Sequence, residues 1–145
     1  DMIRTSTIVR DLRAFGYGVD TFSILPETQD LVRLMQDWSR SMPTRLIGCL
    51  YVMEGSRMGS LVIAKPLAKA LSLAPNKPGG IDYHVEGANT TPVRLKQLKE
   101  RIDQAPFSAD QAEQLVAGAV TFMDGLLKLY AALPVTPRVP QLPIA

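Results

Sequence analysis

Residues 45–73, RLIGCLYVMEGSRMGSLVIAKPLAKALSL, are the stretch that decides the fold. Their apolar residues predict the longest helix of the chain, and Pro66 is expected to kink or break it near its end. Gly48, Gly55 and Gly59 lie inside this helix at spacings of seven and four residues, which place all three on one face. Because each interior glycine costs about 1 kcal/mol relative to alanine, this bare face is expected to lie close to something.

Two kinds of partner explain a bare glycine face, and the spacing alone does not choose between them. The first is a neighbouring helix, because small residues at every fourth position let two helix backbones approach closely. The second is a flat ligand that contacts the backbone directly. Ser56 and Ser60 lie one turn apart and flank the glycine face in either case.

The rest of the chain predicts further helices and no strand pairs. Proline in the first turn favours helix starts at Pro26 and Pro92, and Ser108 with Gln111 has the spacing of a capping box. Trp38, Phe122 and Met123 are expected in the core. The predicted helices span residues 2–15, 26–41, 45–73, 91–104 and 108–133, with a long surface connection containing a helical turn at residues 74–89.

These elements predict an all-α fold with one domain over residues 1–133. The last twelve residues, 134–145, contain four prolines and are expected to form an extended tail. A chain of 145 residues is long enough for one domain with its own core, and 46% hydrophobic and 21% charged residues are ordinary for a soluble globular protein.

Charge and cysteine content limit the partners and the compartment. A net charge of +2 is too small to predict nucleic acid as a partner. The single cysteine, Cys49, excludes a disulfide within the chain and suits the cytoplasm. We expect no membrane partner, because no uninterrupted apolar run reaches the length of a spanning helix and the first residues lack a signal-peptide pattern.

Several kinds of catalytic site are excluded by what the chain lacks. One histidine and one cysteine cannot form a metal cage of several such ligands, so no metal ligands are expected among the side chains. The run GSRMGS, residues 55–60, lacks the lysine of a phosphate-binding loop. His84 lies in a glycine-rich connection without a nucleophilic serine elbow, and is expected to be a solvent-exposed loop histidine.

The run LYVMEGSRMGS, residues 50–60, resembles the distal-helix signature of bacterial heme oxygenases, in which L-Y-V-x-E-G-S-x-x-G precedes an apolar stretch. Other segments resemble the family in order and spacing, so that the likeness covers nearly the whole chain except the tail. These segments are RDLRAFG (10–16), GIDYHVEG (80–87), RLKQLKERID (94–103) and AGAVTFMDGLLKLY (117–130). The resemblance implies a heme oxygenase-like helical bundle with a kinked distal helix.

The resemblance also implies an activity and a set of site residues. Members of the family open heme to biliverdin, iron and carbon monoxide with O2 and electrons from a donor such as ferredoxin or a reductase, and a bilin acceptor is a possible further partner. The residues that it assigns fall into three groups. Gly55, Ser56 and Gly59 would be catalytic; Tyr51, Gly55, Gly59, Ser60, Lys96 and Arg101 would contact heme; Lys99 and Arg57 would lie behind the propionate cations.

The sequence departs from the family at the proximal heme ligand. In the family this ligand is a histidine on the first helix, well before the distal signature, but no histidine precedes His84. We therefore expect that the N-terminal helix bearing this histidine is missing from the 145 residues, and we assign no metal ligand within them. The alternative is a non-catalytic module of the same fold that binds heme or another tetrapyrrole, or serves only as an interaction domain.

Overall fold

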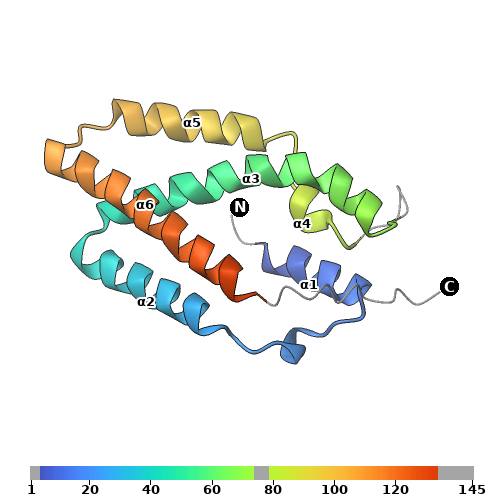
Figure 1. The fold of residues 1–145 in the computed structure, drawn as a ribbon. Helices are drawn as coiled ribbons and strands as arrows, with labels where there is room; N and C mark the ends of the chain where they lie inside the picture. Colours follow the sequence, from blue (N-terminus) through green and yellow to red (C-terminus); the bar gives the residue numbers. More distant parts are fainter. Residues whose placement is uncertain (1–3, 74–78, 134–145) are drawn as a thin grey trace. The chain divides into compact units, whose positions relative to one another are not determined.

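A computed structural model describes residues 4–73 and 79–133. Its helices are α1 (Thr5–Ala14), the short 3-10 helix η1 (Val19–Thr21), α2 (Pro26–Ser41), α3 (Thr44–Ala70), α4 (Asp82–Val85), α5 (Thr91–Gln104) and α6 (Ala109–Ala132) (Figure 1). The described part of the chain contains no strand, so the prediction of an all-α fold is confirmed. The predicted proline tail lies outside the described residues.

The chain forms two compact units. Of the described residues, unit 1 comprises 4–23, 57–73 and 79–89, and unit 2 comprises 24–56 and 90–133. The boundary between them falls between Ser56 and Arg57, inside α3. The prediction of one domain over residues 1–133 remains a prediction.

The α3 helix is continuous from Thr44 to Ala70, although Pro66 lies inside it. The helix therefore does not break at Pro66, and a kink there remains a prediction. Proline removes the hydrogen bond that its own nitrogen would donate, but the helix continues for only four further residues. Backbone bonds from Leu71 to Leu67 and from Leu73 to Ala68 then close its C-terminal end.

The core of unit 2 lies between α2, α3 and α6. Trp38, Cys49, Val52 and Phe122 are its buried members, at most 9% exposed. The predicted core positions of Trp38 and Phe122 are confirmed, whereas Met123 is 44% exposed and its predicted core position is wrong. Burial raises the pKa of the Cys49 thiol, which keeps this side chain a neutral, tightly packed group.

The backbones of α3 and α6 meet at two glycines. A Cβ atom on Gly48 would lie 2.2 Å from the carbonyl oxygen of Leu115 and 2.5 Å from the nitrogen of Ala119. A Cβ on Gly118 would lie 2.3 Å from the carbonyl oxygen of Arg45. Real Cβ atoms do not approach backbone atoms so closely, so only glycine fits at these two positions. Close packing against a neighbouring helix is therefore the reason for Gly48.

The N-terminus of α6 is closed by a capping box. The Ser108 hydroxyl accepts from the backbone N–H of Gln111 at 3.2 Å, and the Gln111 side chain accepts from the backbone N–H of Ser108 at 3.0 Å. This confirms the prediction made from the spacing of the two residues. The two bonds satisfy amide groups that would otherwise lack a partner in the helix.

Substituting Ser108 with alanine is expected to destabilise the protein by about 1 kcal/mol, because one of these reciprocal bonds is lost. Chemical denaturation followed by circular dichroism measures the change. Ser39→Ala is the matched control, since the Ser39 hydroxyl donates only to the carbonyl of Gln36 within the exposed part of α2. A loss in S39A equal to that in S108A would contradict the assignment.

In unit 1, α1 packs against the short helix α4. The Asp11 carboxylate is 8% exposed and accepts three backbone N–H bonds, from Gly80 at 2.7 Å, Asp82 at 3.0 Å and Tyr83 at 2.7 Å. Arg10 Nε also donates to Asp82 at 2.8 Å. The connection at residues 79–89 is thus held on α1, and its predicted helical turn is α4.

Both α3 and α6 are long and apolar enough to cross a membrane by length and composition alone. The expectation of no membrane partner was based on the length of uninterrupted apolar runs. That criterion is stricter than the length and mean hydropathy of a whole helix. A mostly buried core helix also passes this test, but only 28% of the tested window of α3 and 11% of that of α6 are buried. The expectation of no membrane partner remains a prediction.

Candidate functional site

The glycine face of α3 divides into two parts. The backbone of α6 occupies the space where a Cβ atom of Gly48 would lie. A Cβ atom on either Gly55 or Gly59, in contrast, would meet no atom within 4 Å. The first of the two explanations left open by the sequence therefore applies to Gly48, and the second remains a prediction for Gly55 and Gly59. Helix packing explains Gly48, whereas Gly55 and Gly59 present bare backbone with open space beside it, as contact with a flat ligand requires. We call Gly55 and Gly59 the open glycine face.

Polar and aromatic side chains predicted to serve this face lie on the same helix. The Ser56 hydroxyl donates to the carbonyl oxygen of Met53 at 2.7 Å. Its own lone pairs are left to accept a bond from a water molecule or ligand. Ser60 is half-buried, and Tyr51 is 39% exposed. Their roles at the glycine face stay predictions.

A buried ion pair joins α3 to α5 next to the open glycine face. Arg94 Nη2 lies 2.9 Å from Glu54 Oε1, and the side chain of Glu54 is only 4% exposed. The sequence did not predict this pair, because Glu54 and Arg94 are 40 positions apart. A carboxylate in an apolar helix signals that a cation must lie nearby, but the sequence does not show which one.

The predicted propionate cations lie on α5. Lys96 Nζ lies 3.8 Å from Glu100 Oε1 in an exposed pair of the same helix. Arg101 follows Lys96 by five residues, so the two side chains leave the helix about 140° apart. Arg101 instead shares a face with Arg94, seven residues earlier. To bind one anionic ligand together, the side chains of Lys96 and Arg101 would have to extend to it from two different sides of α5.

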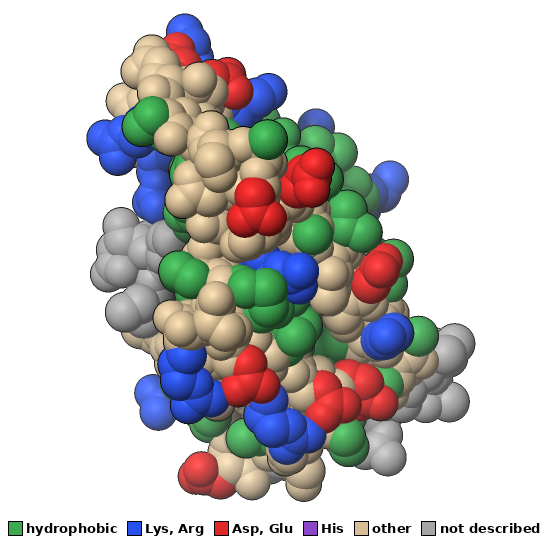
Figure 2. Space-filling model, turned by 90° about the vertical axis from the view of Figure 1, so that its left-hand side faces the viewer, with side chains coloured by type: hydrophobic (Ala, Val, Ile, Leu, Met, Phe, Trp, Pro, Cys, Tyr) green, Lys and Arg blue, Asp and Glu red, His purple; other side chains and the backbone are tan. Residues whose placement is uncertain are grey.

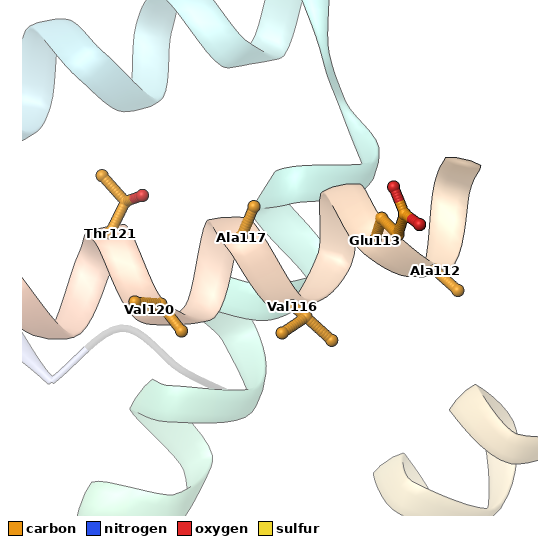
Figure 3. A pocket seen from close by; sticks show the side chains of 6 residues that line it. All are labelled: Ala112, Glu113, Val116, Ala117, Val120 and Thr121. Atoms are coloured by element: carbon orange, nitrogen blue, oxygen red, sulfur yellow. The ribbon is translucent and has the colours of Figure 1, made fainter. Parts of the chain in front are cut away.

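An exposed apolar stripe on α6 was also missed. Val116, Val120, Met123, Leu127 and Tyr130 follow one another at intervals of four and three residues and are 44–61% exposed. An open hollow of about 590 Å³ lies over the first half of this helix (Figure 3). Its lining residues are Ala112, Glu113, Val116, Ala117, Val120 and Thr121. Because α6 is apolar on nearly every side, its sequence could not show which apolar side chains face outward.

Charge is not gathered into one large patch on the face drawn in Figure 2. Basic and acidic side chains are interspersed there among apolar ones. This distribution agrees with the net charge of +2. It gives no support to a nucleic-acid interface, which needs clustered cations.

The described part of the chain has no candidate metal site built from side chains. No group of three or more His, Cys, Asp or Glu residues that could hold a metal ion occurs there. His84 lies in α4 and is half-buried, with its Nδ1 atom buried, so the expectation of a solvent-exposed loop histidine is wrong. A hollow of about 310 Å³ beside it is lined by Asp11, Phe15 and Tyr83 among others.

The family model described as heme oxygenase matches residues 1–123. The chain belongs to the heme oxygenase family. Neither curated proteins nor solved structures gave a match. The heme oxygenase match includes the open glycine face, the Glu54–Arg94 pair, all of α5 and the first part of α6.

Family membership implies heme as the ligand, and the structure can be tested for a fit. A flat macrocycle needs a helix face free of side chains, which Gly55 and Gly59 provide. It also needs apolar surface for its ring and cations for its propionates, and α6 and α5 respectively carry such side chains. These residue types are ones that heme contacts, while the sequence has only one histidine, His84, for its iron.

Proposed function

We propose that this protein is a heme-degrading enzyme that cleaves heme to biliverdin, iron and carbon monoxide with O2 and electrons from an external donor. The observation that carries the proposal is the open glycine face, where a Cβ atom would meet nothing within 4 Å at Gly55 and Gly59. A helix that retains two such costly residues without packing against them has backbone available for a ligand. We also propose that the protein is located in the cytoplasm.

The protein's contribution is positioning, while heme, when bound, supplies the iron that activates oxygen and is itself the substrate. Gly55 and Gly59 let one side of the ring approach the backbone of α3. Ser56 and Ser60 orient water near that face, since the Ser56 hydroxyl already donates to Met53 and its oxygen remains an acceptor.

The edges of the ring would be held by side chains from the other helices. Lys96 and Arg101 on α5 pair with the propionates, each such exposed pair contributing about 0–1 kcal/mol. Tyr51 borders the ring on α3. The exposed stripe of α6 is apolar surface that favours being covered from water. Heme is large and apolar enough to cover it.

The axial ligand is the part of the proposal that needs a group beyond these 145 residues. His84 lies in α4, which α1 holds through Asp11, and we do not assign it to the iron. A histidine from a preceding amphipathic segment would complete the site. The single histidine of the sequence is also the observation that favours the alternative, a tetrapyrrole-binding module without catalysis.

Gly59→Leu is expected to weaken hemin binding at least tenfold, because its side chain would occupy the space of the ring. Stability should be retained or rise by up to about 1 kcal/mol, since leucine is the better helix former. The measurement is a hemin titration followed by the Soret band, then incubation with ascorbate and detection of biliverdin. Lys65→Leu is the control, because residue 65 is exposed on α3 about 120° away from Gly59.

Three outcomes separate the two functions. Binding by the wild type with biliverdin formation supports the enzyme. Binding without biliverdin, in a protein that includes any preceding segment, supports the tetrapyrrole-binding module. A wild type without any spectral response to hemin contradicts both, and equal binding by G59L and K65L contradicts the assignment of the open glycine face.

A further inference from the structure

Unit 1 contains a hollow that shares no residue with the open glycine face. It has a volume of about 310 Å³ and lies where α1 packs against α4. Apolar and aromatic side chains form most of its lining, among them Ile8, Leu12, Phe15 and Tyr83. All of its lining residues belong to unit 1. Its volume is at the lower end of the roughly 300–1,000 Å³ range of small-molecule sites, which suits a ligand of about one ring.

The backbone on the α4 side of this hollow is held in place by Asp11. This residue is 8% exposed, and its carboxylate accepts N–H bonds from Gly80, Asp82 and Tyr83 at 2.7–3.0 Å. Gly80 has a φ of +96°, a conformation that other residues rarely adopt. A Cβ atom on Gly80 would lie 3.2 Å from Cζ of Phe15, so the aromatic ring lies close against this backbone. The fold therefore sets this part of the lining before any ligand binds.

The aromatic side of the hollow is fixed by residues outside the lining. The guanidinium carbon of Arg4 lies 4.4 Å from the centroid of the Tyr83 ring, a cation–π contact. Arg4 Nη2 also donates to the carbonyl oxygen of Glu86 at 3.0 Å, and the hydroxyl of the buried Thr7 donates to Glu86 Oε2 at 2.6 Å. These contacts hold α4 on α1. A wall that is already ordered binds a ligand without the entropic cost of ordering it.

His84 adds one hydrogen-bonding ring to this apolar lining. Its ring is edge-on to that of Tyr83, with 5.5 Å between the centroids and 87° between the planes. Its Nδ1 atom is buried and has no hydrogen-bond partner among the described residues. An N–H group at Nδ1 would be a costly unsatisfied donor, so the neutral imidazole carries its proton on Nε2. Nε2 makes no bond within the described part of the chain, which leaves its N–H group to donate to a bound molecule.

We propose that this hollow is a binding site for a neutral, single-ring aromatic molecule with one hydrogen-bond acceptor, of the phenol class. The ring of the ligand packs against Phe15 and Tyr83, and its oxygen accepts from Nε2–H of His84. A neutral ligand fits better than a carboxylate, because the Asp11 carboxylate is part of the same lining and repels a second negative charge. This inference does not rest on the proposed function.

The test is an NMR titration with p-cresol at pH 8, with toluene as the matched probe that lacks an acceptor. His84 is the single histidine of the sequence, so its ring Hε1 signal is a unique reporter inside the lining. We expect p-cresol to shift this signal and to bind with a dissociation constant of about 1 mM or below, roughly tenfold more tightly than toluene. Equal binding of the two probes to the wild type would overturn the role of His84. No binding of either probe would overturn the site.

Two variants separate the hydrogen bond from the apolar lining. His84→Phe keeps an aromatic ring without Nε2–H, and amide signals of α4 replace Hε1 as the reporter. We expect p-cresol and toluene to bind this variant about equally. Ile8→Trp fills the hollow from α1 and is expected to weaken binding of both probes by roughly tenfold or more.

Val19→Trp is the matched control for Ile8→Trp. Val19 is 51% exposed on η1 of the same unit and does not line the hollow, so V19W should bind p-cresol as the wild type does. Ile8 is itself 42% exposed, and circular dichroism is expected to show wild-type helicity in I8W. Wild-type affinity in I8W, or an equal loss in I8W and V19W, would overturn the site. If H84F unfolds, the comparison of p-cresol with toluene in the wild type still decides the role of His84. Hemin takes no part in these titrations, so failure of the proposed function is seen separately.

Discussion

Replacing Gly48 with alanine is expected to destabilise the protein by about 3 kcal/mol, whereas replacing Gly55 with alanine is expected to stabilise it by about 1 kcal/mol. The two residues lie on one face of the same helix and differ only in what lies against them. An added Cβ on Gly48 would lie 2.2 Å from the backbone of α6, so the two helices must move apart. An added Cβ on Gly55 meets nothing within 4 Å, so only the gain in helix propensity remains.

Urea denaturation of both variants measures these opposite signs directly. Gly118→Ala serves as a second test of the crossing, because a Cβ there would lie 2.3 Å from the carbonyl oxygen of Arg45. It is expected to behave as G48A does. A loss of stability in G55A as large as that in G48A would show that the open glycine face is packed against another part of the protein.

Asp11→Ala is expected to cost about 4 kcal/mol, the largest effect that we anticipate for a polar residue. Three backbone N–H groups, those of Gly80, Asp82 and Tyr83, would lose their acceptor in a site that is 8% exposed. Each unsatisfied buried donor costs about 1–3 kcal/mol, and water that enters the space left by the carboxylate offsets part of the sum. Thermal unfolding compared with the wild type measures the loss.

Asp11→Asn distinguishes hydrogen bonding from packing at the same position. Its amide oxygen can still accept from Gly80 and Asp82, but its NH2 group would face the N–H of Tyr83, where two donors oppose each other. An intermediate loss is therefore expected. Asp20→Ala, at an exposed position of η1, should change stability by less than about 0.5 kcal/mol. Equal stability of D11A and D20A would contradict the role of Asp11.

Local signals in the sequence predicted much of the secondary structure. The bounds of α2 and α5 agree with the predicted ranges because proline occupies the first turn of each helix and fixes its start. The capping box of Ser108 and Gln111 likewise fixes the start of α6. These signals lie within a few residues of one another, so sequence alone is sufficient to find them.

The contacts of the candidate site depended on tertiary structure and were less predictable. The spacing of Gly48, Gly55 and Gly59 showed that they share a face, but not that α6 ends its contact before Gly55. The Glu54–Arg94 pair joins residues 40 positions apart, which no helical periodicity links. Met123 was predicted in the core beside Phe122, yet adjacent residues on a helix point about 100° apart and only Phe122 faces the core.

The boundary between the two units falls inside α3, so that both units contain part of this one helix. Starting a helix is unfavourable by a factor of roughly 1000, equivalent to about 4 kcal/mol, whereas extending an existing helix is close to neutral at each residue. If unit 2 folds first and forms α3 up to Ser56, the segment from Arg57 to Ala70 only has to be added turn by turn. In that order, unit 1 would receive its longest helix already nucleated, and the glycines next to the boundary would determine how readily that extension proceeds.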